Sequence, residues 1–193
     1  MSQSARRPAT LDDFWAIPET ERFHELVGGE LIQKAAPSAE HGDAQAGVVG
    51  AVRAPFQRKP GGGGPGGWWI ATEVEVLLQT GELVRPDVLG WRRETCPERP
   101  TGAPVRLRPD WICEVISPGN AKDDTVKKLR LYHQVGIAHY WIVDPRDSTL
   151  TVMRCTADGY VTLMRAERAE VVRAEPFTAI ELAVGTLFGD DPD

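Results

Sequence analysis

One apolar segment, PDWICEVISPGN at residues 109–120, constrains the fold of this chain more than any other stretch. Its central residues, 111–116, are apolar except for Glu114, which is typical of a buried strand, and Pro118 and Gly119 end the run. A buried carboxylate costs free energy unless another group pairs with it or it binds a metal ion. The fold must therefore cover this strand and provide a partner for Glu114.

Hydrophobic periodicity and turn residues predict the elements around this strand. Three helices are expected, at residues 11–17 with Thr10 as N-cap, at 37–57, and at 121–136. The middle helix has a buried stripe of Ala44, Val48, Val52 and Phe56. Hairpins are expected at residues 23–34 around Gly28-Gly29, at 68–91 around Thr80-Gly81, and at 149–165 around Asp158-Gly159, with a further strand at 139–145.

This order predicts an α/β fold with a mixed central sheet, helices that cover the central strands, and extra N- and C-terminal hairpins. We expect one domain over residues 1–193, with a frayed end at 189–193. Residues 59–67, KPGGGGPGG, match no phosphate-binding pattern and are predicted to be a flexible connector.

Composition narrows the class of protein. The chain has 193 residues, 41% of them hydrophobic, and no apolar run approaches the roughly 18 residues needed to span a membrane. The N-terminus has no apolar signal region, and the three cysteines form neither a zinc pattern nor a disulfide framework. We therefore expect a cytoplasmic protein that does not associate with membranes.

The charge distribution argues both for and against binding of nucleic acid. A net charge of -6 argues against a generally basic nucleic-acid binder. Local compensation is expected from basic residues on both sides of the Glu114 strand: Arg92, Arg93, Arg99, Arg106 and Arg108 in the loop before it, and Lys122, Lys127, Lys128 and Arg130 after it.

A second carboxylate, Asp87, is expected beside Glu114. Asp87 lies in the second arm of the 68–91 hairpin, and consecutive antiparallel strands usually pair. Two neighbouring carboxylates repel each other, and a divalent cation is the usual remedy. Oxygen ligands favour magnesium or manganese over zinc, so the pair predicts a site for Mg²⁺, or for Mn²⁺.

The helix after the Glu114 strand brings a lysine toward this pair. Asp124, Lys128 and Tyr132 are spaced by four residues and share one helix face. The turn at residues 117–120 is short, so the helix packs back near the end of the strand and Lys128 can reach the carboxylates. A lysine there can stabilise negative charge that develops on a phosphoryl oxygen.

Structural roles can explain the same residues. Asp87 after a proline can be a turn residue, Glu114 can face water at a sheet edge, and Asp124 with Lys128 can be a surface ion pair. His41 fits a buried helix end better than a metal ligand. Glu73 and Glu75, which alternate with valines, are expected on a solvent-facing side of their strand.

Several segments, in this order, resemble the Uma2 family, also called DUF820: FHELVGGELI, PSAEH, RPDVLGW, PDWICEVISPGN and DTVKKLRLYHQVGIAHYWIVDP. The resemblance covers about residues 10–165. It implies a restriction-endonuclease-like fold of the PD-(D/E)xK nuclease superfamily, which agrees with the mixed sheet predicted from the elements.

The resemblance also implies roles for individual residues. Asp87 matches the motif aspartate and Glu114 the motif acidic residue, both metal ligands. The motif lysine should stand at position 116, where this chain has Ile116, so Lys128 on the next helix is the matching position. His41 matches a further polar site position.

The implied activity is hydrolysis of phosphodiester bonds in DNA with Mg²⁺ as cofactor. In this interpretation Asp87, Glu114 and Lys128 are catalytic, and Asp124 and Tyr132 orient Lys128. The protein is expected to be a homodimer, as is common in this superfamily. Two alternatives stay open: a non-catalytic interaction protein that keeps the nuclease fold, and a hydrolase of small phosphorylated molecules.

Overall fold

The computed structural model describes residues 7–117 and 121–191, with residues 121–124 described by their backbone alone. Three α-helices follow the predicted order: α1 (Leu11–Trp15), α2 (Ala39–Phe56) and α3 (Ala121–Gln134). Two short 3-10 helices are η1 (Glu19–Glu21) and η2 (Val184–Phe188). Thr10 caps α1 in a capping box with Asp13, as its position in the sequence predicts.

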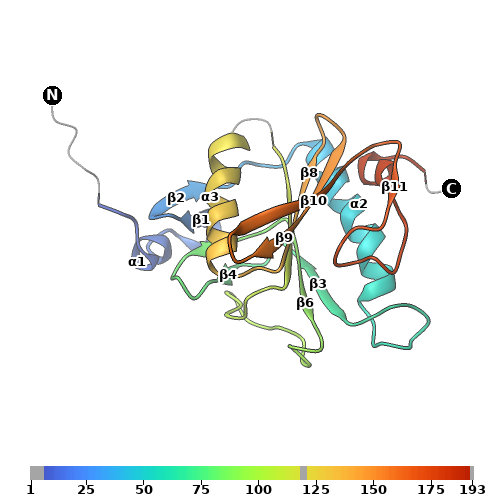
Figure 1. The fold of residues 1–193 in the computed structure, drawn as a ribbon. Coiled ribbons are helices and arrows are strands. Elements are labelled where there is room, and N and C mark those ends of the chain that lie inside the picture. Colours follow the sequence, from blue (N-terminus) through green and yellow to red (C-terminus); the bar gives the residue numbers. More distant parts are fainter. Residues whose placement is uncertain (1–6, 118–120, 192–193) are drawn as a thin grey trace.

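A six-stranded mixed sheet forms the centre of the molecule (Figure 1). Its strand order is β10-β9-β8-β7-β6-β3, and β7 and β8 are parallel whereas the other neighbours are antiparallel. The strand bounds are β3 (Trp68–Thr72), β6 (Val88–Arg92), β7 (Trp111–Val115), β8 (His139–Asp144), β9 (Thr149–Thr156) and β10 (Gly159–Glu167). The predicted mixed sheet is confirmed, with the Glu114 strand β7 in its interior.

A second sheet lies beside the central one and has the order β2-β1-β5-β4. Its strands are β1 (His24–Val27), β2 (Glu30–Gln33), β4 (Val76–Leu77) and β5 (Leu83–Val84). The predicted N-terminal hairpin is therefore confirmed as β1 and β2. A third pairing joins β11 (Val171–Val172) to β12 (Leu182–Ala183).

The long hairpin predicted over residues 68–91 is confirmed in its pairing, because Thr72 pairs with Val88 and Val76 with Val84 in one register around the Thr80-Gly81 turn, but its arms are shared between two sheets. Its outer parts, β3 and β6, pair in the central sheet, whereas the inner strands β4 and β5 pair in the second sheet. The chain leaves the central sheet at Glu73, which has a left-handed φ of 54° and donates its N–H to the Pro86 carbonyl oxygen at 3.2 Å. This turn links the two sheets and holds residues 73 and 87 close together.

Helices α2 and α3 cover the central sheet from different sides (Figure 1). The predicted stripe on α2 is confirmed, because Ala44, Val48, Val52 and Phe56 are all buried in one core cluster with Trp111. Residues of α3 and β8, among them Leu131, Tyr132 and Tyr140, belong to the other large cluster. Tryptophan and tyrosine side chains therefore fill the core around β7 and β8.

Close packing of α2 depends on one glycine. A Cβ atom added at Gly47 would lie 2.8 Å from the Leu187 Cα and from the Thr186 carbonyl oxygen in η2. This approach holds the C-terminal segment against the helix. Asp190 accepts hydrogen bonds from Arg168, and because residues 192–193 lie outside the described part, the frayed end at 189–193 stays a prediction.

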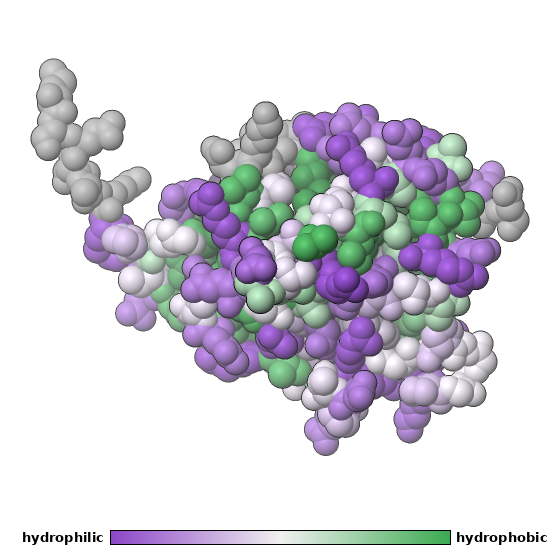
Figure 2. All heavy atoms as spheres, viewed as in Figure 1, coloured by the Kyte–Doolittle hydropathy of each residue, from purple (hydrophilic) through white to green (hydrophobic). Residues whose placement is uncertain are grey.

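Polar residues cover most of the surface in the view of Figure 2, and hydrophobic residues appear there in separate patches. Within the residues that the structure describes, no helix is long and apolar enough to cross a membrane. Residues 59–67 contain neither helix nor strand, as expected for a connector.

Candidate active site

Two carboxylates lie side by side at one end of the central sheet. Asp87 directly precedes β6, Glu114 lies in β7, and the pairing of Val88 with Cys113 makes them neighbours across the antiparallel ladder. The Val115 N–H donates to Asp87 Oδ2 at 2.7 Å. The structure thus brings together the two residues that sequence reasoning selected, and both are buried.

Asp87 is surrounded by groups that favour its charged form. Lys34 Nζ lies 3.0 Å from Oδ1 and His41 Nε2 lies 3.5 Å from the same oxygen. Burial alone would raise the pKa of Asp87, but the contacts with His41, Lys34 and the Val115 N–H outweigh it and hold this pKa well below its usual value. His41 Nδ1 in turn lies 2.9 Å from Ser117 Oγ.

Lys34, a residue that sequence reasoning missed, occupies the space between two acidic side chains. Its ammonium group donates to Asp87 Oδ1 at 3.0 Å, to Glu73 Oε2 at 3.0 Å and to the Arg85 carbonyl oxygen at 2.7 Å. Burial would lower the pKa of Lys34, but Asp87 and the other carboxylates around it raise it. Lys34 is therefore a fixed positive charge at the Asp87 side of the site.

The expectation that Glu73 and Glu75 only face solvent is wrong in part. The Glu73 side chain is 43% exposed, but its carboxylate contacts Lys34, and the partial loss of solvent around this carboxylate raises its pKa against the effect of that lysine. Glu75 is half-buried and pairs with Arg85. Their strand pattern was misleading because Glu73 starts the turn between the sheets.

Glu114 shares Lys128 with a third buried carboxylate. Lys128 Nζ lies 2.7 Å from Glu25 Oε2 and 3.2 Å from Glu114 Oε1, and all three side chains are almost inaccessible to solvent. Tyr132 donates its phenolic hydrogen to Glu114 Oε1 at 2.6 Å. Burial raises the pKa of Glu114 to about 7, with Asp87 and Glu25 adding to the shift and Lys128 opposing it.

The supporting residues predicted on α3 have different outcomes. Tyr132 contacts Glu114 directly, so its hydroxyl positions the carboxylate rather than acting through Lys128 alone. Asp124 belongs to the residues whose side chains the structure does not describe, and its predicted role stays a prediction.

Glu25 could have been found from the sequence by the criterion that selected Glu114. It lies in the short strand HELV, next to two apolar residues, and is 1% exposed. Its second oxygen, Oε1, accepts a hydrogen bond from the Arg85 N–H at 2.7 Å. Lys34 offered no comparable signal, because it follows the last residue of β2 and precedes the small residues Ala35 and Ala36.

The departure from the nuclease motif at position 116 is visible in the structure. Ile116 borders the same cavity as Glu114, and its N–H donates to the Val143 carbonyl oxygen at 2.8 Å. Its hydrocarbon side chain can neither carry charge nor donate a hydrogen bond. Positive charge instead comes from Lys34 and Lys128, on separate elements.

These groups line a cavity of about 850 Å³ between the two sheets and the start of α2. Its polar lining includes Glu25, Lys34, His41, Gln45, Glu73, Arg85, Asp87, Glu114 and Lys128. Apolar side chains complete it, namely Phe23, Ile32, Ala35, Ala36, Pro37, Val115 and Ile116. Such a volume is typical of pockets that enclose a small molecule or part of a larger one.

The charge balance of the cavity fits a divalent cation. Arg85 is paired with Glu75, and the other ionisable lining groups are four carboxylates and the ammonium groups of Lys34 and Lys128, so two negative charges are left over when every carboxylate is ionised. Among the described residues, no group of three or more His, Cys, Asp or Glu side chains could hold a metal ion alone. Magnesium commonly keeps several waters and binds through one or two carboxylates, so Asp87 and Glu114 suit it.

The arginines expected to compensate the acidic charge lie elsewhere. Asp87 and Glu114 lie at the same end of the paired strands β6 and β7. Arg92 is the last residue of β6, at the opposite end, about 16 Å along the strand from Asp87. The loop with the other four arginines leaves from that opposite end, and none of the five belongs to the described lining of the cavity. This loop joins the end of β6 to the start of β7, so it lies away from Asp87 and Glu114, and its contribution to DNA affinity stays a prediction.

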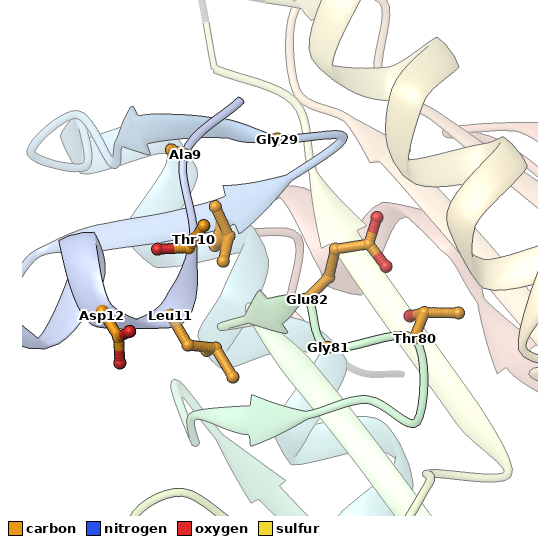
Figure 3. Close-up of a pocket in the computed structure, with 9 residues that line it drawn as sticks. Ala9, Thr10, Leu11, Asp12, Gly29, Thr80, Gly81 and Glu82 are labelled. Atoms are coloured by element: carbon orange, nitrogen blue, oxygen red, sulfur yellow. The ribbon is translucent and has the colours of Figure 1, made fainter. Parts of the chain in front are cut away.

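A smaller cavity of about 380 Å³ lies between residues 9–12 and the Thr80-Gly81 turn (Figure 3). Asp12 and Glu82 come from opposite sides of it. Its lining contains these two acids but no lysine, arginine or histidine among the described residues. The larger cavity is therefore the candidate active site.

Comparisons with known proteins show the family and the fold. The family model Uma2, described as "Putative restriction endonuclease", matches residues 11–185. The chain is also similar to a crystal structure of a "putative nuclease belonging to DUF820" from Anabaena variabilis, with a TM-score of 0.74 and 24% sequence identity, over 94% of this chain and 98% of that one. This likeness confirms the predicted fold class. Among curated proteins, no match is found.

Proposed function

This chain belongs to the Uma2 family, and we propose that it is a metal-dependent nuclease that hydrolyses phosphodiester bonds. The observation that carries the proposal is the pair of buried carboxylates, Asp87 and Glu114, on adjacent strands at the floor of an accessible cavity. Buried acids with perturbed pKa values in a cavity are frequent in active sites.

Asp87 and Glu114 would hold Mg²⁺ or Mn²⁺. When bound, such an ion lowers the pKa of a coordinated water and polarises the phosphate. Asp87 is already fixed for this role by the Val115 N–H and is kept ionised by Lys34 and His41. Glu114 is held in place by Tyr132 and Lys128, which both contact Oε1.

Lys128 would supply the positive charge that the motif usually obtains from the position of Ile116. Its ammonium group lies at the floor of the cavity, 3.2 Å from Glu114 Oε1. Fixed charges in a site with little water stabilise developing negative charge on a phosphoryl oxygen strongly. Glu25, at 2.7 Å from Lys128, fixes the position of this lysine.

Nicking of supercoiled plasmid DNA tests the activity. With Mg²⁺ or Mn²⁺ we expect conversion to open circles, and we expect none from the double variant Asp87→Ala, Glu114→Ala. A matched control, Glu98→Ala with Asp158→Ala, removes two exposed acids outside the cavity and should cut normally. Equal nicking by the active-site variant would refute the proposal.

A second candidate is hydrolysis of a small phosphodiester. The distance of the arginine-rich loop from the cavity favours it, because affinity for duplex DNA depends on many Lys and Arg contacts to phosphates. A chromogenic phosphodiester that is cleaved while plasmid stays intact would select this candidate. Homodimer formation, expected from the superfamily, stays a prediction that light scattering can measure.

A further inference from the structure

The apolar rim of the active-site cavity has no role in the proposed hydrolysis. Phe23 lies there and is 57% exposed, although large aromatic side chains are usually buried. The exposed residues Ala35, Ala36 and Pro37 continue the rim after β2. One side of the entrance is therefore an apolar wall, whereas the floor is ionic.

The hairpin β1–β2 places this wall next to the ionic floor. The Lys34 N–H donates to the Phe23 carbonyl oxygen at 2.8 Å, so these two residues face each other across the hairpin. Lys34 contacts Asp87 at 3.0 Å. Phe23 also lies two residues before Glu25, on the same face of the strand, and Glu25 contacts Lys128. A planar group resting on Phe23 would thus have its attached phosphate directed toward both lysines.

The charged groups of the cavity do not suit a duplex backbone. Each lining cation already contacts a carboxylate: Lys34 with Asp87 and Glu73, Arg85 with Glu75, and Lys128 with Glu25 and Glu114. Binding of duplex DNA draws its affinity mainly from cations that replace counterions along the phosphates. Binding of single strands adds stacking of bases on aromatic side chains.

The depth of the carboxylates in the cavity also favours a single strand as the substrate. The carboxylates are almost completely buried, so a scissile phosphate must enter the cavity to reach them. Enzymes that modify a base inside a pocket take single strands or extrude one nucleotide from the duplex, which costs unstacking energy, and the same cost applies to a nucleotide that must enter this cavity. An unpaired strand avoids that cost.

From the apolar rim beside the ionic floor we infer that the cavity binds an unpaired nucleotide of a single strand. This inference rests on the proposed nuclease function. The base of this nucleotide stacks on Phe23 beside the wall of Ala35, Ala36 and Pro37, and its phosphate enters toward Lys34 and Lys128. Arg85, whose guanidinium carbon lies 5.7 Å from the centre of the Phe23 ring, restrains the aromatic side chain.

Fluorescence anisotropy with a short oligodeoxythymidine tests the inference without requiring cleavage. The comparison strands are the same length of abasic backbone, with equal charge, and the matching duplex with oligodeoxyadenosine, each in EDTA and in calcium. We expect the thymidine strand to bind more tightly than both. Phe23→Ala should weaken its binding by about 5- to 150-fold, the range for loss of one stacked base, while Phe23→Tyr retains binding.

Trp15→Ala is the matched control, because Trp15 is also partly exposed and stacked by an arginine, Arg22, but lies outside the cavity. It should bind like the unchanged protein. Equal binding of the abasic or duplex strand, unchanged binding by Phe23→Ala, or no binding of any strand would overturn the inference. If the thymidine strand binds most tightly and Phe23→Ala weakens that binding, but no DNA is cleaved in Mg²⁺, only the proposed reaction is refuted. If DNA is cleaved but the strands bind equally, only this inference is refuted.

Discussion

Replacement of Lys128 by methionine is the most informative single change for the buried network. Lys128 Nζ lies between Glu25 and Glu114, at 2.7 and 3.2 Å, and its side chain is 5% exposed. Methionine retains much of the length and apolar volume but removes the charge. Two buried carboxylates then face each other without their shared cation.

The expected loss in the free energy of unfolding is about 3–5 kcal/mol, the usual cost of removing one partner from a buried ion pair. That is a large part of the about 5–15 kcal/mol that stabilises a typical domain. The control is the neighbouring Lys127→Met. Lys127 pairs with Glu30 at 2.8 Å, but the two side chains are 39% and 61% exposed, so we expect a loss of about 0–1 kcal/mol.

The effect of Lys128→Met should depend on pH. The pKa of Glu114 is about 7, above its ordinary value, so the folded state binds a proton more tightly than the unfolded state and stability falls as the pH rises from about 4.5 to 7. Lys128 opposes this shift, and its removal raises the pKa further. The difference between variant and unchanged protein is therefore larger at pH 8 than at pH 5.

Urea unfolding followed by circular dichroism at both pH values measures these differences. A loss for Lys128→Met that equals the loss for Lys127→Met, or a difference that does not depend on pH, would refute the coupling of Lys128 to buried charged carboxylates.

Three further predictions follow from other contacts. Gly47→Ala should lower thermal stability through its clash with Leu187, by about 1–3 kcal/mol, whereas Gly50→Ala, with open space in the same helix, should raise it by about 0.5–1 kcal/mol. Calorimetric affinity for Mn²⁺ should be about tenfold higher at pH 8 than at pH 6, because Glu114 must lose its proton to bind metal; equal affinities would contradict this. Tyr132→Phe should cost about 1.5–3 kcal/mol in urea unfolding, because a buried hydrogen bond to a carboxylate is lost; an unchanged midpoint would contradict it.

The main elements could be predicted because their signals are local. The Thr10 cap, the stripe of α2, the glycine turn of the first hairpin and the apolar run of β7 each depend on a few neighbouring residues. The split of residues 68–91 between two sheets could not be predicted in this way. It depends on the left-handed turn at Glu73 and on pairing of β5 with β1, a strand far away in the sequence.

In the candidate site, too, contacts between segments far apart in the sequence could not all be predicted. Asp87, Glu114 and Lys128 could be selected because strand order and helix spacing place them together. Glu25 carries a sequence signal as an acid in a short apolar strand, whereas Lys34 enters the site only through the packing of the second sheet against the first, which the sequence pattern did not reveal. The arginine-rich loop lies at the opposite end of the sheet from the site, because it joins the end of β6 to the start of β7.

Calorimetric titration with Mn²⁺ at pH 8 tests the proposed metal site most directly. We expect one ion per chain, with binding abolished by Asp87→Asn and by Glu114→Gln. Glu30→Gln, which changes an exposed acid outside the cavity, should leave the isotherm unchanged. Binding that survives both active-site substitutions, or no binding by the unchanged protein, would contradict a metal-dependent nuclease at this site.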